Sequence, residues 1–111
     1  MFERVTQGAV DVIRGDAPLN AEHAEEVSLL LAGCLSSGRP YVVLDFDKVP
    51  LIDSAGLELV LDFQEKLQQL GGALKLASVN SLPSDILSAT GIREGFEIFP
   101  EALSAVGSFV R

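Results

Sequence analysis

The residues whose types and spacing could do chemistry stand in one stretch, Asp53-Ser54-Ala55-Gly56-Leu57. The stretch follows an apolar run and a short loop, which together span 41–50, and it opens a segment of apolar periodicity from Leu57 to Leu70. A serine therefore lies where a strand and a loop become a helix, and Ser and Asp oxygens at such a place accept hydrogen bonds from the first-turn N–H groups. The positive end of the helix would suit a phosphate on Ser54, and Gly56 would let another molecule approach the backbone closely.

Enzymatic chemistry has less support in this chain. A nucleophile elbow would need a glycine two residues before the serine, but residue 52 is Ile. The lone histidine, His23, is expected at the surface in the first turn of a helix rather than beside a nucleophile. Asp45, Asp47 and Asp53 could lie near one strand end and bind Mg²⁺, although Asp47 is expected in the loop. No P-loop or other glycine-rich nucleotide motif occurs. We therefore predict a protein that is not an enzyme and that has no metal and no cofactor.

Composition and charge indicate a single small domain, residues 1–111, that does not bind nucleic acid. At 48% hydrophobic residues the chain can bury a core, and 111 residues leave room for only one. The formal net charge is −8, whereas phosphate binding needs clustered Lys and Arg. Acidic residues gather between Asp11 and Glu26, which leaves open both a solvated acidic surface and a contact with a basic partner.

Export and membrane signals are not recognisable in the sequence. Residues 1–4 do not resemble a signal peptide, and no apolar run approaches membrane-spanning length. We therefore expect a cytoplasmic protein without direct membrane insertion. The single cysteine, Cys34, excludes an internal disulfide and falls on an apolar helical stripe, where it is expected to be a small core residue.

Strand and helix patterns alternate along the chain, with a hairpin turn at Gln7-Gly8-Ala9. The expected strands cover 5–6, 10–13, 41–46, 74–79 and 96–99. The first expected helix is capped by Asn20 and stopped by Gly38, and the second runs from about Ser54 to Leu70. The third is capped by Ser81 or Ser84 and ends at Gly91. The last has Pro100 in its first turn and runs through Val110, with Leu103, Val106 and Val110 inward. This order predicts an α/β fold with a mixed, mostly parallel sheet of about five strands and about four helices. We expect the helices to cover one face of the sheet more than the other.

The second expected helix has a wide apolar arc. At 100° per residue the arc spans roughly 200°, which is more than one sheet contact usually needs. Its members are Leu57, Leu59, Val60, Leu61, Phe63, Leu67 and Leu70. The edge formed by Leu57 and Leu61 lies beside Ser54, where either other helices cover it or a partner protein binds it.

Three segments in this order resemble the STAS domain, as found in bacterial anti-sigma-factor antagonists. Residues 49–57 contain an apolar stretch followed by Asp-Ser, a small residue, Gly and an aliphatic residue. Residues 71–76 form a Gly turn into a strand, and residues 87–92 form a short helix closed by Thr-Gly-Ile. The resemblance covers nearly the whole chain and implies a single-domain STAS-like fold.

The resemblance also implies a function. In anti-sigma-factor antagonists the serine directly after the Asp is phosphorylated by a partner that is both anti-sigma factor and serine kinase, of histidine-kinase-like ATPase fold, and a serine phosphatase reverses the step. Ser54 is the matching position, and Ala55 stands where many relatives have Ser or Thr. The dephospho form would bind the kinase and displace its sigma factor. The partner-binding residues implied are Asp53, Ser54, Ala55, Gly56, Leu57, Glu58 and Leu61.

Two function classes remain open. The first is this phosphorylation-switched module, in which a phosphate on Ser54 would meet repulsion from Asp53 and Glu58 and so spoil the interface. The second is a non-phosphorylated STAS subunit that docks through the same helix, for example an accessory component of a membrane transporter or of another signalling complex.

Overall fold

The computed structural model describes residues 1–38 and 40–109, and its elements alternate as the sequence indicates. In chain order they are β1 (Phe2–Gln7), β2 (Val10–Gly15), α1 (Ala24–Ser36), β3 (Tyr41–Asp45), α2 (Ser54–Gln69), β4 (Ala73–Ala77), α3 (Ser81–Ala89), the 3-10 helix η1 (Ile92–Gly95), β5 (Ile98–Phe99) and α4 (Ala102–Ser108).

The five strands form one mixed sheet in the order β1-β2-β3-β4-β5. The hairpin strands β1 and β2 pair antiparallel, and every later pair is parallel. Val12 of β2 lies opposite Val43 of β3, which in turn lies opposite Lys75 of β4. The predicted α/β class, the mixed sheet of five strands and the four α-helices are confirmed.

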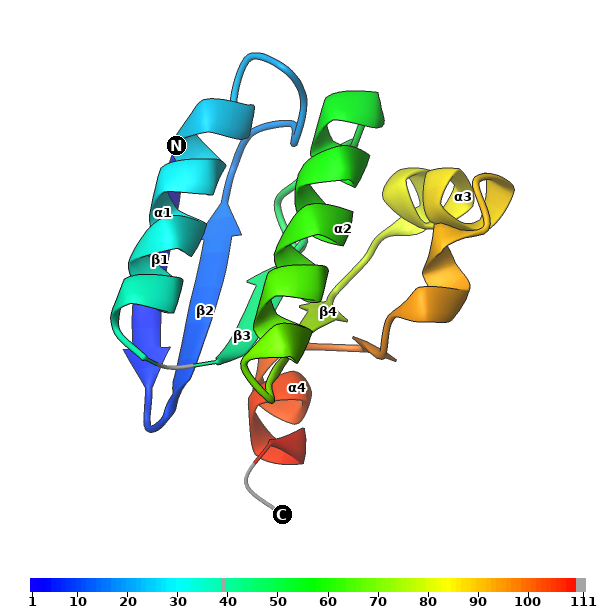
Figure 1. Ribbon diagram of the computed structural model, residues 1–111. Coiled ribbons are helices and arrows are strands. Elements are labelled where there is room, and N and C mark those ends of the chain that lie inside the picture. The colour runs from blue at the N-terminus through cyan, green and yellow to red at the C-terminus, as the bar shows by residue number, and fades with distance from the viewer. Residues whose placement is uncertain (39, 110–111) are drawn as a thin grey trace.

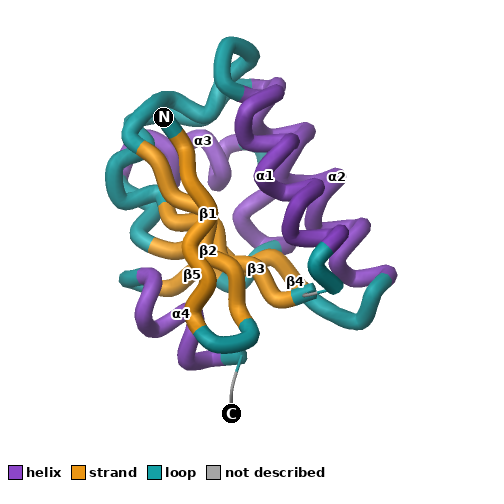
Figure 2. Tube along the Cα trace, turned by 90° about the vertical axis from the view of Figure 1, so that its left-hand side faces the viewer, coloured by secondary structure: helices purple, strands orange, loops and turns teal. Residues whose placement is uncertain are grey.

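Helices cover the two faces of the sheet unequally (Figures 1 and 2). The helices α1 and α2 run side by side over one face, where the larger core cluster contains Val27, Leu44 and Phe63. The short helix α4 lies on the opposite face, where Ala105 joins a smaller cluster with Val12. Because parallel strands end at the same edge, the loops that lead into α1 and α2 meet there.

The helix α1 begins at Ala24, so the predicted start at Asn20 is wrong. The Asn20 side chain accepts a hydrogen bond from the His23 N–H at 3.3 Å and closes a turn that precedes the helix. His23 takes the N-cap position without a side-chain cap bond. An Asn side chain that bonds to nearby backbone favours a turn over a helix start, which explains the delay.

The predictions for the last two helices need corrections. Ser81 is the first residue of α3, and the capping position belongs to Asn80. The helix α4 begins after an extended Glu101, so Leu103 is 71% exposed although it was expected inward, and Ala105 makes the sheet contact instead. Val110, also expected inward, lies outside the described residues.

Candidate functional site

The start of α2 lies against the loop that joins β2 to α1 (Figure 1). An isolated parallel bridge pairs Leu19 of that loop with Ile52. The Leu19 N–H donates to the Leu51 carbonyl at 3.0 Å, and the Asp53 N–H donates to the Leu19 carbonyl at 3.2 Å. Two segments far apart in the sequence therefore hold each other in place just before Ser54.

Asp53, and not Ser54, is the N-cap of α2. One carboxylate oxygen of Asp53 accepts a hydrogen bond from the Gly56 N–H at 3.1 Å, as is usual for a capping side chain. The other carboxylate oxygen accepts from the Ala21 N–H at 3.3 Å. The same carboxylate thus stabilises the helix start and the neighbouring turn.

Replacing this carboxylate should destabilise the protein measurably. We expect Asp53→Ala to lower the free energy of unfolding by about 1 kcal/mol or somewhat more, because it removes the cap and leaves the Ala21 N–H without its acceptor. Urea titration followed by circular dichroism measures the change. Asn80→Ala is the matched control, since Asn80 holds the N-cap position of α3 without a side-chain cap bond. Equal losses in the two variants would contradict this role for Asp53.

The Ser54 hydroxyl is left available by this arrangement. Ser54 is the first residue of α2 and its side chain is exposed. Within residues 1–38 and 40–109, no hydrogen bond engages the hydroxyl. The alternative that this serine serves only as a helix cap is therefore not supported, because Asp53 performs that task.

The contact at Gly56 differs from the prediction that an external molecule approaches there. Gly56 is buried, and a Cβ atom at this position would lie 2.3 Å from the Leu19 carbonyl oxygen and 2.8 Å from Ile52 Cγ1. The close neighbour is thus the chain itself. Glycine is needed at this position because the loop before α1 packs directly on the first turn of α2.

The residues implied as partner-binding differ in how far they are exposed to solvent. Ser54 and Glu58 are exposed, and Leu61 is 44% exposed. Asp53 and Ala55 are half-buried, while Gly56 and Leu57 are buried. Leu57 is only 8% exposed because it packs in the larger core cluster. Of the two alternatives left open for this edge, coverage by the protein itself therefore applies to Leu57. Of the residues implied as partner-binding, Ser54, Glu58 and Leu61 are therefore the exposed ones.

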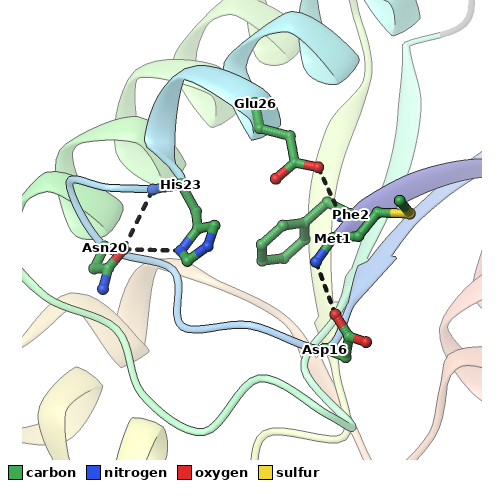
Figure 3. A network of polar contacts seen from close by, with 6 residues as sticks. All are labelled: Met1, Phe2, Asp16, Asn20, His23 and Glu26. Carbon is green, nitrogen blue, oxygen red and sulfur yellow. Dashed lines mark hydrogen bonds and ion pairs between the residues drawn. The ribbon is translucent and has the colours of Figure 1, made fainter.

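The histidine lies in a separate network at the start of α1 (Figure 3). His23 Nδ1 is 3.1 Å from Asn20 Oδ1, and the His23 ring centroid is 6.2 Å from that of Phe2. The Phe2 N–H donates to Glu26 at 3.0 Å, which ties β1 to α1. These contacts give His23 a structural place between the first strand and the first helix.

Of the three carboxylates considered for Mg²⁺, those of Asp45 and Asp53 accept backbone hydrogen bonds. The Asp45 carboxylate accepts a hydrogen bond from the Asp47 N–H at 3.0 Å. The Asp53 carboxylate accepts hydrogen bonds from the N–H groups of Ala21 and Gly56. Among the described residues, no group of three or more His, Cys, Asp and Glu side chains is arranged to hold a metal ion. In the same part of the chain, no helix has the length and hydropathy to cross a membrane.

Cys34 is fully buried, as predicted, and we expect it to be chemically inert in the folded protein. Burial, together with the nearby Asp11 carboxylate, raises the pKa of its thiol to about 11. At pH 8 only about 0.1% would be thiolate, the reactive form. A disulfide reagent should modify it many times faster in denaturing urea than in buffer. Equal rates in the two conditions would contradict this prediction.

Comparison with known proteins identifies the family. A sequence model of the STAS domain matches residues 2–105. The chain is 33% identical over 86 residues to BtrV of Bordetella bronchiseptica, which is provisionally named an anti-sigma factor antagonist; the match covers 78% of this chain and 72% of BtrV.

Solved structures share the fold. A provisionally named anti-sigma factor antagonist of Thermotoga maritima superposes with a TM-score of 0.92 at 22% identity, covering 99% of this chain and 95% of that one. The Bacillus cell fate determinant SpoIIAA in its phosphorylated form gives a TM-score of 0.77 at 18% identity and covers 100% of both chains. The murine anion transporter Slc26a9 gives 0.76 at 18% identity, and the match covers 92% of this chain but 18% of the transporter. With its fold, its Asp-Ser helix start and the match over residues 2–105, the chain belongs to the STAS domain family.

Proposed function

We propose that this STAS domain is an anti-sigma-factor antagonist whose binding is switched by phosphorylation of Ser54. In the dephospho form it sequesters an anti-sigma factor that is also a serine kinase, and a serine phosphatase restores that form. The observation that carries the proposal is the exposed Ser54 hydroxyl at the start of α2, freed from capping by Asp53. The similarity to BtrV, which is named an anti-sigma factor antagonist, and the existence of a phosphorylated form of SpoIIAA support it.

The electrostatics of the site suit a switch that acts on an interface. A phosphate adds about −1.5 to −2 charges, and its neighbours are the Asp53 carboxylate and Glu58 one turn along the helix. The protein already carries a formal net charge of −8. The phosphorylated surface therefore differs sharply in charge from the dephospho surface, and a partner fitted to one disfavours the other.

Phosphorylation should depend on this one serine. With the partner kinase and labelled ATP, we expect Ser54→Ala to abolish labelling. Ser81→Ala is the matched control, since Ser81 is also an exposed first residue of a helix but belongs to α3. It should leave labelling unchanged. Label that persists in Ser54→Ala and maps by mass spectrometry to another serine, such as Ser36 or Ser78, would refute the assignment.

The proposal includes a cytoplasmic location and no catalytic activity of the domain itself. Purified protein alone should not hydrolyse esters, phosphoesters or nucleoside triphosphates above background, because the only histidine and the only cysteine are engaged in the network at α1 and in the core. Mg²⁺-dependent turnover that survives repeated purification and disappears in a folded Asp53→Ala variant would overturn this part of the proposal.

A second candidate is an accessory STAS subunit of a membrane transporter that is not phosphorylated. The fold shared with part of the murine anion transporter favours it. The two candidates are separated by one pull-down from the native organism. Recovery of a transporter with unmodified Ser54 supports the second, and recovery of a histidine-kinase-like ATPase supports the first.

A further inference from the structure

The helices α3 and η1 form an arm, Ser81–Gly95, that stands beside α2 at one end of the sheet (Figure 1). Every residue of the arm is described; Pro83 and Leu87 are buried, and Ile86 and Ile92 pack partly buried against the larger core cluster. By contrast, α2 buries Gly56, Leu57, Val60, Phe63 and Leu67. An element with so few buried side chains is expected to separate from the body of the protein more easily than the rest.

The arm is held together internally. The Arg93 guanidinium of η1 donates to the Ser84 hydroxyl of α3 at 2.6 Å. The Thr90 hydroxyl donates to the Ile86 carbonyl at 2.8 Å and closes the end of α3. Gly91, with a φ of 75°, then turns the chain into η1. These contacts couple the two helices, so the arm should move as one unit.

One side-chain hydrogen bond fastens the far end of the arm to α2. Gln64 Nε2 donates to the Gly95 carbonyl at 2.6 Å. The other end of the same amide is unsatisfied, because Gln64 Oε1 is buried and has no hydrogen-bond partner in the described part of the chain. A buried acceptor without a hydrogen-bond partner destabilises the closed form, and opening the arm would let water donate a hydrogen bond to it. The hydrogen bond from Gln64 to Gly95 therefore holds the arm against α2, and we call it the latch. The unsatisfied Oε1 atom lowers the free-energy cost of breaking it.

An open surface cleft lies at the base of the arm. It has a volume of about 460 Å³ and is lined by Asn80 and Arg93 together with Ile98 and Phe99 of β5. Just before the arm, Ser78 has a φ of 55°, which is unusual for a residue other than glycine, and its N–H donates to the Phe99 carbonyl at 3.0 Å. The strand side is thus anchored at Ser78, and the link Val79–Asn80, in which Val79 is only partly buried against the core, is where the chain would have to turn.

We propose that the arm opens and closes as a rigid unit while the sheet stays folded. The chain enters the arm through Val79–Asn80 and leaves it through Phe96, before Glu97, whose carbonyl accepts the Leu76 N–H of β4 at 3.0 Å. These two links are the hinge, and the Gln64–Gly95 hydrogen bond is the latch. Leu87 of the arm and the adjacent Phe96 belong to the same core cluster as Leu57 of α2. Opening therefore uncovers apolar surface on the side of α2 that carries Gln64. The closed and open forms present different surfaces beside the helix that begins with Ser54, whether or not that serine is phosphorylated.

Hydrogen exchange read by mass spectrometry tests the opening in the purified full chain. We expect amides throughout 84–95 to exchange with one common opening equilibrium, well before those of β2 and β3. Gln64→Glu breaks the latch, because a carboxylate oxygen then faces the Gly95 carbonyl oxygen. Exchange of the arm should rise about tenfold or more, with β3 unchanged. Gln68→Glu is the matched control, since Gln68 lies one turn further along α2 and is exposed.

Three results would overturn the proposal. The arm could exchange only at the rate of β3, which would mean that it opens only on global unfolding. Alternatively, Gln64→Glu and Gln68→Glu could have equal effects on the arm, or α3 and η1 could exchange with different opening equilibria. None of these outcomes depends on a kinase or partner, so the opening is tested separately from the switch at Ser54.

Discussion

A negative charge at Ser54 should weaken partner binding by at least about 30-fold, which corresponds to about 2 kcal/mol. We expect this of phosphorylated Ser54 and, to a smaller extent, of Ser54→Asp. The hydroxyl is exposed at the helix start, and the added charge joins Asp53 and Glu58 on a surface that the partner must desolvate. Calorimetric titration of the partner kinase with each form measures the affinity.

Two controls separate charge from shape and from folding. Ser54→Asn has nearly the size of Ser54→Asp without its charge and should keep most of the affinity. Circular dichroism of both variants should match the unmodified protein, because Asp53 and not Ser54 caps the helix. The loss in Ser54→Asp should shrink as salt rises, since exposed charges are screened. Equal affinity of the phosphorylated and dephospho forms would refute the switch.

Gly56→Ala should destabilise the protein, although alanine is a better helix former than glycine. The new Cβ would lie 2.3 Å from the Leu19 carbonyl oxygen, which is a backbone atom and cannot rotate away. Either α2 or the loop before α1 must shift, and overpacking of this kind costs about 1–3 kcal/mol. The midpoint of urea denaturation should fall accordingly. The shift would also strain the Asp53 contacts with Leu19 and Ala21.

Gly107→Ala provides the comparison for this prediction. Gly107 also lies within a helix, but a Cβ there would meet nothing within 4 Å. Alanine has the higher helix propensity, so this variant should gain up to about 1 kcal/mol. If Gly56→Ala were equally stable, the close packing of Leu19 on α2 would be wrong.

The strands and the start of α2 could be predicted because their signals are local. The apolar run before residue 46 predicts β3, Asp53 and Ser54 mark the beginning of α2, and Gly71 follows its end. Periodicity and capping residues act within a few positions, so one sequence displays them. The exposed position of Ser54 follows from the same signals, since the first residue of a helix that follows an Asp cap need not pack on anything.

The features that could not be predicted depend on segments far apart in the sequence. Gly56 looks available to a partner until Leu19, more than thirty positions earlier, is placed against it. The wide apolar arc of α2 is visible in the sequence, but which part is covered depends on how the arm and the loop before α1 pack. That is why Leu57 proved buried and Leu61 exposed. The sequence does not fix the start of α1, because an Asn side chain such as that of Asn20 closes a turn as readily as it caps a helix.

The position of α4 has a consequence for synthesis on the ribosome. Each strand pairs with the one made just before it, so the sheet can assemble in the order in which the chain emerges. Its second face, however, carries Val10, Val12 and Val43, which pack against Ala105 of α4, the last element of the domain to be made. Until then the nascent chain displays an apolar surface with α1 and α2 already docked behind it. A chaperone that recognises apolar surfaces would bind the nascent chain mainly in that interval, and it would be released when α4 docks on the sheet.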